Sequence, residues 1–420
     1  MKKAAILAMA VLLNAQNITE LLNAIDKTAD SRLDEIMIKE TKINKNIISY
    51  SMYPKISLFA NYVHYNEDMS VMPITPTESS KLIRTNSSIP FSQNIARVGI
   101  DISFPLFIKS IYDNKKKMSY LLNATTYMAK INRLKREASL ISAVSNLNYL
   151  FRLKDALNKE ADSIQTSIDA IKVGVEVGRI PEFKLLRLKD AKNQLKIKIE
   201  DINANIAKMQ SLIYKLTKIK IDSIIPINSY SFKKGEFISV KPLKEQLKAS
   251  NYDIKSKKDA FLPKITFKIN ANRAFAKAYN TGDQIALNSA NAGIYISWDI
   301  FNKKNSGEIQ KSKILQTKTN LQIQKTIKDL TAEIDSINRQ LKTIKKSIIL
   351  TKNSISLKEE LLKGAKVAFK LDRMNVDEYL KYEDDLALAK AKLANLIAQK
   401  NSLIAQKAFI YGKNLKKVFK

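Results

Sequence analysis

Cysteine is absent from the 420-residue sequence, and histidine occurs once, as His64. Without cysteine the chain can form no disulfide, no thiolate metal site and no cysteine nucleophile. A single histidine excludes an HExxH motif and any multi-histidine metal site. A glycine-rich phosphate loop is missing too, because the only Gly-Lys pair, Gly412-Lys413, lacks the upstream glycine. The acidic pair Asp384-Asp385 falls in a predicted helix, where we interpret it as solvated. We therefore predict that the protein is not an enzyme and that it has no catalytic residue, metal site or cofactor.

Glycine and proline are scarce, with nine of each. A chain so poor in helix breakers favours long uninterrupted helices. Beyond the N-terminus, no apolar run approaches the length that a membrane-spanning helix needs. If the chain enters a membrane, it must do so with β-strands, because lipid cannot satisfy unpaired backbone groups.

Negative charge is also scarce. There are 72 basic and 40 acidic residues, which gives a net charge of +32. The positive electrostatic field of such a chain favours nucleic acid or an anionic membrane as a partner. The lysines are nevertheless scattered at helical spacing, and the densest cluster is only Lys115-Lys116-Lys117. We interpret them as solvated helix faces and expect no nucleic-acid partner. A basic coiled coil that binds nucleic acid remains the weaker alternative.

The first fifteen residues resemble a signal peptide. Lys2 and Lys3 precede an apolar run over residues 4–13, and Ala15 offers a small residue for cleavage. The run is too short to span a bilayer as a helix. Residues 1–15 therefore predict export. An exported structural or adhesive coiled coil is the second alternative.

The sequence contains an internal repeat. Residues 98–107 match residues 292–301, at a separation of 194 residues. The segment Val177-Gly178-Arg179 matches Leu371-Asp372-Arg373 at the same separation. Residues 53–58 match 262–267 at a separation of 209, so the first of two hairpins has the longer loop. The chain is therefore predicted to contain two copies of one structural unit.

Each copy contains two segments in which apolar and polar residues alternate. They predict strands at about residues 54–65, 94–107, 263–276 and 290–301. Four strands cannot close a barrel, and an open edge is costly in lipid. Three chains would supply twelve strands, enough for a barrel with a lumen. A soluble antiparallel sheet is the alternative. Several aromatic residues near the strand ends suggest an aromatic girdle: Tyr62, Phe104, Phe107, Trp298 and Phe301.

Long helices follow each pair of strands. Phe107 and Gly178 are 71 residues apart, as are Phe301 and Asp372, and apolar residues there recur at heptad spacing. A helix of about 70 residues rises roughly 105 Å. The first repeat is predicted over residues 17–216, with a helical hairpin at 108–216, and the second over 241–413, with a hairpin at 302–411. Residues 217–240 are predicted as an irregular strap at the helices' equator, and 414–420 as a basic tail.

This order of elements resembles the TolC or outer-membrane efflux protein family. The resemblance rests on the Pro-Lys-Ile strand starts, the Ile-Ser-Phe and Ile-Ser-Trp strands and the two turns, and covers about residues 17–413. It implies long antiparallel coiled-coil hairpins and a twelve-stranded barrel shared by a homotrimer. It also implies a passive duct of a tripartite efflux or type I secretion system in the outer membrane of a Gram-negative bacterium. The implied partners are outer-membrane lipid, a periplasmic adaptor (membrane fusion) protein and an inner-membrane pump of RND or ABC type.

The same resemblance implies site residues at the helical turns. Adaptor contacts fall on Val177, Gly178, Arg179, Leu371, Asp372 and Arg373, although Asp372 stands where the family has glycine. Acidic side chains after the second turn surround the family's periplasmic mouth. This places a periplasmic gate at Asp377, Glu378 and Lys381. Lys381 departs from the acidic pattern, and Asp377 and Glu383 lie nearby as candidates to replace it.

Overall fold

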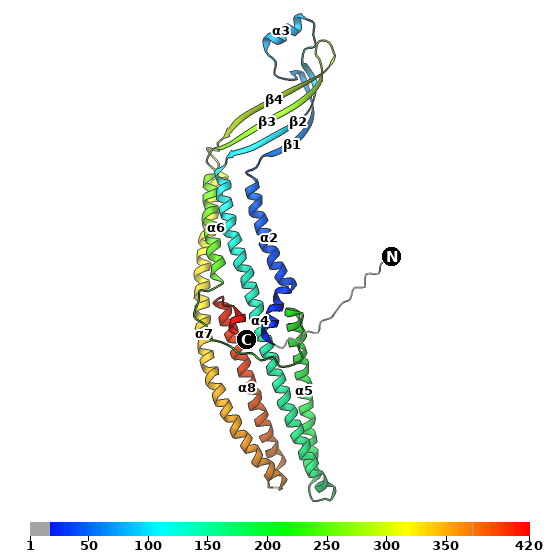
Figure 1. The fold of residues 1–420 in the computed structure, drawn as a ribbon, viewed down its shortest axis with the longest axis vertical. Coiled ribbons are helices and arrows are strands. Elements are labelled where there is room, and N and C mark those ends of the chain that lie inside the picture. The colour runs from blue at the N-terminus through cyan, green and yellow to red at the C-terminus, as the bar shows by residue number, and fades with distance from the viewer. Residues whose placement is uncertain (1–16, 372) are drawn as a thin grey trace, which may run out of the picture. The chain divides into compact units, whose positions relative to one another are not determined.

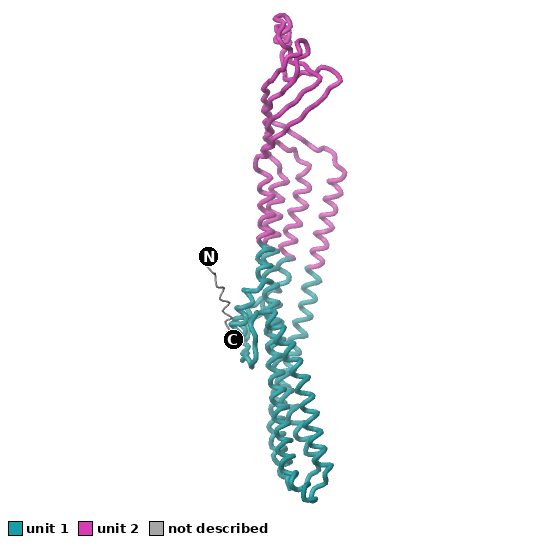
Figure 2. Tube along the Cα trace, turned by 90° about the vertical axis from the view of Figure 1, so that its right-hand side faces the viewer, with its two compact units in different colours: residues 1–38, 125–242, 323–420 teal, residues 39–124, 243–322 magenta. Residues whose placement is uncertain are grey.

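The computed structural model describes residues 17–371 and 373–420. The predicted signal peptide and Asp372 lie outside these residues. The chain divides into two compact units, which do not coincide with the sequence repeats. Unit 1 comprises the described residues up to 38, residues 125–242 and those from 323 onward, and unit 2 comprises residues 39–124 and 243–322 (Figure 2). Each unit thus takes segments from both predicted repeats.

The elements alternate between helices and strand pairs (Figure 1). In chain order they are α1 (Ile18–Ala24), η1 (Ile25–Lys27), α2 (Ala29–Tyr50), β1 (Lys55–Ser70), α3 (Pro76–Arg84), β2 (Phe91–Phe107), α4 (Lys109–Glu176), α5 (Glu182–Thr217), α6 (Val240–Asp259), β3 (Lys264–Lys277), β4 (Gln284–Ser297), α7 (Lys303–Lys370), α8 (Val376–Ile410) and α9 (Leu415–Val418). Among the described residues, none of these helices combines the length and apolarity that crossing a membrane requires.

The element lengths repeat along the chain. α4 and α7 each contain 68 residues, and the helices that follow them contain 36 and 35. The turns also match in their backbone bonds, since Arg179 N–H donates to Gly174 O and Arg373 N–H donates to Ala368 O. Both bonds reach back five residues, which is the Schellman pattern at a helix end.

Unit 2 contains one antiparallel sheet in the order β1-β2-β3-β4. Four of its strand ends differ from the predicted bounds by more than one residue. β1 continues to Ser70, β2 begins at Phe91, and β4 begins at Gln284 instead of residue 290 and ends at Ser297 instead of 301. The second hairpin is longer than predicted because residues 284–289 pair in full register with 272–277. The chain reverses between Ala278 and Asp283.

The loop between β1 and β2 contains a helix that the strand analysis did not predict. α3 begins with a capping box, in which Thr75 accepts a hydrogen bond from Glu78 N–H and the Glu78 side chain accepts one from the Thr75 backbone. The same loop contacts the second hairpin, since Asn280 Oδ1 accepts a hydrogen bond from Ile89 N–H at 2.8 Å.

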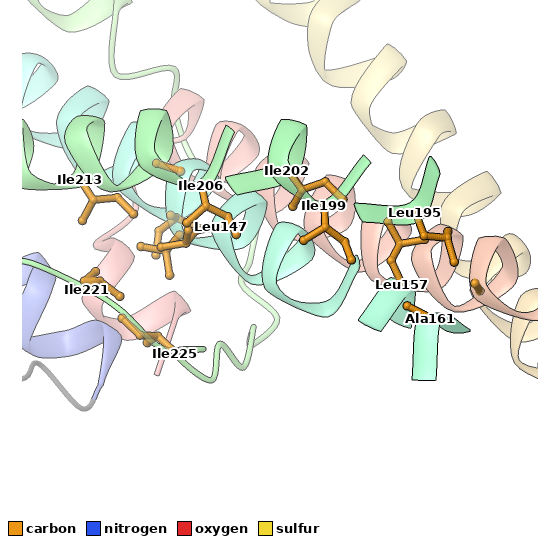
Figure 3. Close-up of a cluster of buried hydrophobic side chains, with 14 of the residues drawn as sticks. Leu147, Leu157, Ala161, Leu195, Ile199, Ile202, Ile206, Ile213, Ile221 and Ile225 are labelled. Carbon is orange, nitrogen blue, oxygen red and sulfur yellow. The ribbon is translucent and has the colours of Figure 1, made fainter. Parts of the chain in front are cut away.

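Unit 1 has an apolar core formed by helices and an irregular segment (Figure 3). The heptad positions predicted on α4, including Leu157, Ile164 and Ile168, are buried there against α5. The predicted strap, residues 217–240, is irregular over residues 218–239, because its first and last residues belong to α5 and α6, and it contributes Ile221 and Ile225 to the same core.

Residues 414–420, predicted as a basic tail, pack into unit 1. Leu415, Val418 and Phe419 are buried, and Phe419 forms an isolated β-bridge with Ser229 of the strap. The alternation of apolar and basic residues over these seven positions explains the difference, because the apolar ones face the core while the lysines stay near the surface.

Candidate functional site

The sheet of unit 2 presents an apolar face to solvent. On every strand, the residues of one parity are mainly aliphatic and point to the same side, because side chains alternate along a strand. Leu58 is 80% exposed and Ile296 is 68% exposed. We define the apolar face by these and their neighbours: Ile56, Leu58, Val98, Ile100, Ile294 and Ile296. An exposed apolar surface of this kind marks an interaction with a membrane or a protein.

On the opposite side of the sheet, the part that we call the polar face carries charged and amide side chains, whereas toward the loops Ile95 and Ala274 are buried in an apolar cluster. It is defined by Lys55, Ser57, Arg97, Asp101, Ser103, Lys268, Asn270, Asn272 and Asn291. Asn270 Nδ2 donates to Asp101 Oδ1 at 2.7 Å, and Lys268 Nζ lies 4.9 Å from the centre of the Tyr295 ring. A sheet with one apolar and one hydrated face can separate lipid from water.

The aromatic residues predicted as a girdle lie near the two ends of the apolar face. Phe104 pairs with Phe267, and Phe107 pairs with Ile265, at the ends of the strands that adjoin the helices of unit 2. Trp298 and Phe301 follow β4 at the same end, and Trp298 Nε1–H donates to the carbonyl of Phe261. Tyr62 lies toward the loops, where its hydroxyl donates to Asn94. The girdle itself stays a prediction.

β1 and β4 are the edge strands of the sheet. β1 contains 16 residues and β4 contains 14, so both edges are long. A long edge beside an apolar face is a template for pairing with another chain. Because the sheet has two unpaired edges and an exposed apolar face, it needs further contacts, with another chain or with a membrane.

The predicted adaptor contacts form two exposed turns in unit 1. Val177 and Leu371 are exposed, and Gly178 has a φ of +70°, which favours glycine. Ile180 packs over Gly174, where a Cβ atom would lie only 2.7 Å from the Ile180 Cδ1 atom. Asp372 lies outside the described residues.

The predicted gate residues begin α8. Asn375 is its N-cap, since its Oδ1 accepts a hydrogen bond from Glu378 N–H at 2.8 Å. Glu378 and Lys381 are exposed. Asp377 forms an ion pair with Arg187 of α5, with Nε 3.0 Å from Oδ1. Asp377 is therefore a link between two helices.

A buried polar network connects α8 to α4 and α7. The Tyr379 hydroxyl donates to Glu383 Oε1 at 2.6 Å and lies 3.0 Å from Ser167 Oγ. Ser163 also donates to Glu383, and Lys366 Nζ lies 3.4 Å from the same carboxylate oxygen. Burial and the Glu383 hydrogen bond raise the pKa of Tyr379 to about 12, so the phenol stays protonated. Glu383 is only 4% exposed, so it does not replace Lys381 at a solvent-facing mouth.

A second buried carboxyl lies on α4, one helical turn before the serines. Glu160 is 6% exposed, and its Oε2 atom has no hydrogen-bond partner. Burial, and then the negative charge of Asp384, raise the pKa of Glu160 to about 7, against the opposing effect of Lys198. The charge of Glu160 is therefore sensitive to pH near neutrality.

Sequence reasoning missed the Tyr379 network, the Arg187–Asp377 pair and the burial of Glu160. Ser167 and Tyr379 are 212 residues apart, and no local pattern connects them. A signal for Glu160 was present, because it lies between the heptad residues Leu157 and Ala161. A charged residue beside such a seam is a candidate for partial burial.

The sequence matches no protein-family model and no curated protein. Solved structures match its fold. The CmeC outer membrane channel of Campylobacter jejuni aligns with a TM-score of 0.77 and 17% identity, covering 94% of this chain and 85% of that chain. The outer membrane protein VceC of Vibrio cholerae aligns at 0.76 and 12% identity, covering 94% and 96%.

A third solved structure matches equally well. The MtrE outer membrane channel of Neisseria gonorrhoeae, in its open state, aligns at 0.75 and 12% identity, covering 95% of this chain and 90% of that chain. At these identities the likeness establishes the fold. The chain thus has the fold of outer membrane channels, with long helical hairpins and a small antiparallel sheet, and this prediction from the sequence is confirmed.

Proposed function

We propose that this chain is one subunit of a homotrimeric outer-membrane efflux channel. The observation that carries the proposal is the four-stranded sheet with an exposed apolar face, a polar face and two long edges, in a fold shared with outer membrane channels. In lipid, each unpaired backbone group on an edge costs several kcal/mol. Pairing β4 of one copy with β1 of the next removes both edges, and three copies close a twelve-stranded barrel.

In this arrangement the apolar face contacts outer-membrane lipid and the polar face lines a water-filled lumen. The helices extend the passage into the periplasm. The chain carries no phosphate-binding motif, so energy for transport comes from a partner, an inner-membrane pump of RND or ABC type, joined by a periplasmic adaptor protein. The duct is passive and not an enzyme. A tripartite efflux system and a type I secretion system would both use such a duct, and the pump decides between them.

The absence of native cysteine allows a direct test of the barrel. Ala60 on β1 is replaced by cysteine and combined with single cysteines scanned along residues 286–294 of β4. We expect disulfides between neighbouring copies at positions of one parity, with covalent species of two and three chain masses and none larger. As the control, cysteines at Leu157 and Leu195, which belong to one buried cluster within a chain, are expected to produce no covalent oligomer.

The alternatives predict different results. An exported structural coiled coil would leave β1 and β4 uncrosslinked and would be released from membranes without detergent. A nucleic-acid-binding coiled coil would bind DNA with strong salt dependence. A detergent-extracted trimer of the outer-membrane fraction that conducts ions in planar bilayers supports the channel. A water-soluble monomer would exclude it.

We also propose that the exposed turns of unit 1 serve the periplasmic end. Val177, Gly178, Arg179, Leu371, Asp372 and Arg373 form the adaptor contact, and Asp377, Glu378 and Lys381 lie at the gate. Three copies of Glu378 near one axis would attract cations. The variant Glu378→Ala is expected to weaken block by multivalent cations from the periplasmic side. Unchanged block would leave Glu378 with its role at the N-terminus of α8 alone.

For the adaptor contact, Val177→Asp is expected to abolish crosslinking to the adaptor in cells while leaving trimer assembly intact. Val173→Asp is the matched control, because Val173 is also exposed on α4 but lies one helical turn before the turn itself. Equal loss of crosslinking in both variants would argue against a contact centred on the turn.

A further inference from the structure

The polar face of the sheet carries more positive than negative charge. Lys55, Arg97 and Lys268 are basic, and Asp101 is the acidic residue among them. Lys264, at the start of β3, has the same parity but is paired with Asp299 at 3.4 Å. We propose that this face makes the channel selective for anions. The inference rests on the proposed function, in which the polar face lines the lumen.

The two lysines share one register row. Lys55 pairs with Ser103, Ser103 pairs with Lys268, and Lys268 pairs with Gly293. This row lies near the end of the sheet that adjoins α2 and α6. In a threefold assembly, symmetry places three copies of each lysine at one level along the axis. Six ammonium groups therefore surround the lumen within a short length of passage.

Lys268 is held apart from acidic groups. Its Nζ atom lies 4.9 Å from the centre of the Tyr295 ring, a cation–π contact. The same ring covers Gly293, since a Cβ atom there would lie 3.4 Å from a Tyr295 ring carbon. Glycine at position 293 thus leaves room for the ring to support the lysine from the neighbouring strand.

The carboxylate that lies between these basic residues accepts a hydrogen bond from an amide. Asp101 accepts a hydrogen bond from Asn270 at 2.7 Å. Within residues 17–371 and 373–420, no ion pair at 4.0 Å or less connects Asp101 with Lys55, Arg97 or Lys268. The positive charges of Lys55, Arg97 and Lys268 are therefore not neutralised by Asp101. Fixed positive charges in a narrow aqueous passage concentrate anions and repel cations.

The reversal potential of single channels measures this selectivity. Purified trimers in planar bilayers under a KCl gradient are expected to pass chloride over potassium by about threefold or more. In the double variant Lys55→Glu with Lys268→Glu, six positive groups become negative and the preference is expected to reverse. The rest of the passage is identical in both proteins, so the shift reports the polar face alone.

The matched control is Lys277→Glu, on β3 but of the opposite parity, which leaves the ratio unchanged. A second double variant, Lys55→Gln with Lys268→Gln, introduces no acidic group; if the glutamate variant fails to assemble, this one is expected to move the ratio toward unity. Channels that prefer potassium, or a ratio that none of the polar-face variants alters, would overturn the inference while leaving the channel. If no conductance forms at all, both proposals fail.

Discussion

The two units of the chain differ in where they place apolar and polar side chains. Unit 1 buries aliphatic residues in two clusters, a large one that includes α4, α5, α8 and the strap and a smaller one between α7 and the end of α8. In unit 2 the sheet exposes residues such as Leu58, while polar groups connect the helices, with Asp253 bonded to both Lys117 and Ser312. Burial of apolar surface is the main favourable term in folding. Unit 1 is thus stabilised by its own core, whereas the sheet of unit 2 depends on backbone pairing and on what covers its apolar face.

The sharpest test of this contrast is one substitution made in both units. Leu147 in unit 1 is fully buried, so Leu147→Ala is expected to lower the free energy of unfolding by about 2–5 kcal/mol. Leu58→Ala on the apolar face is expected to change it by less than about 0.5 kcal/mol in detergent. Guanidinium unfolding followed by circular dichroism measures both. Equal losses would mean that the apolar face has a protein partner within the purified particle.

In unit 2, a side-chain atom added where two strand backbones lie close together is expected to destabilise the sheet. A Cβ atom at Gly99 would lie 2.5 Å from the Ala271 carbonyl oxygen and 2.6 Å from the Asn272 Cβ atom. Gly99→Ala is therefore expected to destabilise the sheet by about 1–3 kcal/mol. The melting temperature of the β-sheet infrared band measures the loss. Gly293→Ala, where the nearest atom belongs to the Tyr295 side chain, is expected to cost less, and the reverse order would contradict the pairing register.

Burial of the Glu160 carboxyl should make the stability of unit 1 depend on pH. Since folding raises the pKa of Glu160 from an ordinary value of 4.5 to about 7, the folded state binds more protons than the unfolded state between these pH values. Stability therefore falls as pH rises from about 4.5 to about 7 and stays lower above it. Glu160→Gln cannot ionise, so it is expected to exceed the wild type in stability at pH 8 by about 1–2 kcal/mol, after allowance for solvent screening.

Urea unfolding at pH 5 and pH 8 measures that change. The control is Glu359→Gln, because the hydrogen bond from Lys390 holds the pKa of Glu359 below its ordinary value. That variant is expected to be slightly less stable than the wild type at pH 8. A gain of equal size in both variants would contradict burial of Glu160 as the cause.

Polar contacts within the unit 1 core should contribute least. Tyr379→Phe removes the hydroxyl that bonds Glu383 and Ser167, but Glu383 keeps Lys366 and Ser163. We expect a loss of about 0.5–1.5 kcal/mol. Tyr382→Phe, on the same helix and only partly buried, is the control. Chemical denaturation compares the two, and a loss above that of Leu147→Ala would mean that polar bonds, and not apolar packing, dominate this unit.

Much of the fold was predictable because its main elements repeat a short pattern. Period-two alternation indicated all four strands, and heptad spacing indicated the long helices, on which Ile334 and Ile337 are buried in a second, smaller cluster of unit 1. The ends of β4 were not predicted because polar residues such as Asn288 continue the pairing without an apolar signal. α3 could have been found from the spacing of Thr75 and Glu78.

The candidate site was predictable only in part, for a physical reason. The turns and the acidic start of α8 are local features, and the structure has them where the sequence indicated. The link from Arg187 to Asp377 spans 190 residues, and the sequence offers many equivalent partners for one arginine. The heptad spacing marks Glu160 as a candidate for burial, but whether the carboxyl is buried depends on packing between helices that are distant in the sequence.

One ion pair has a consequence for biogenesis. Lys416 Nζ lies 3.1 Å from Asp26, 390 residues earlier, beside the pair that Asp26 makes with Arg133. Unit 1 therefore joins the beginning of the described chain to its end. Contacts of such sequence separation form late and slowly. Nearly the whole polypeptide must therefore leave the ribosome before this unit can fold completely. Until then its isoleucine-rich helices are exposed, and we expect that other proteins must bind them to prevent aggregation.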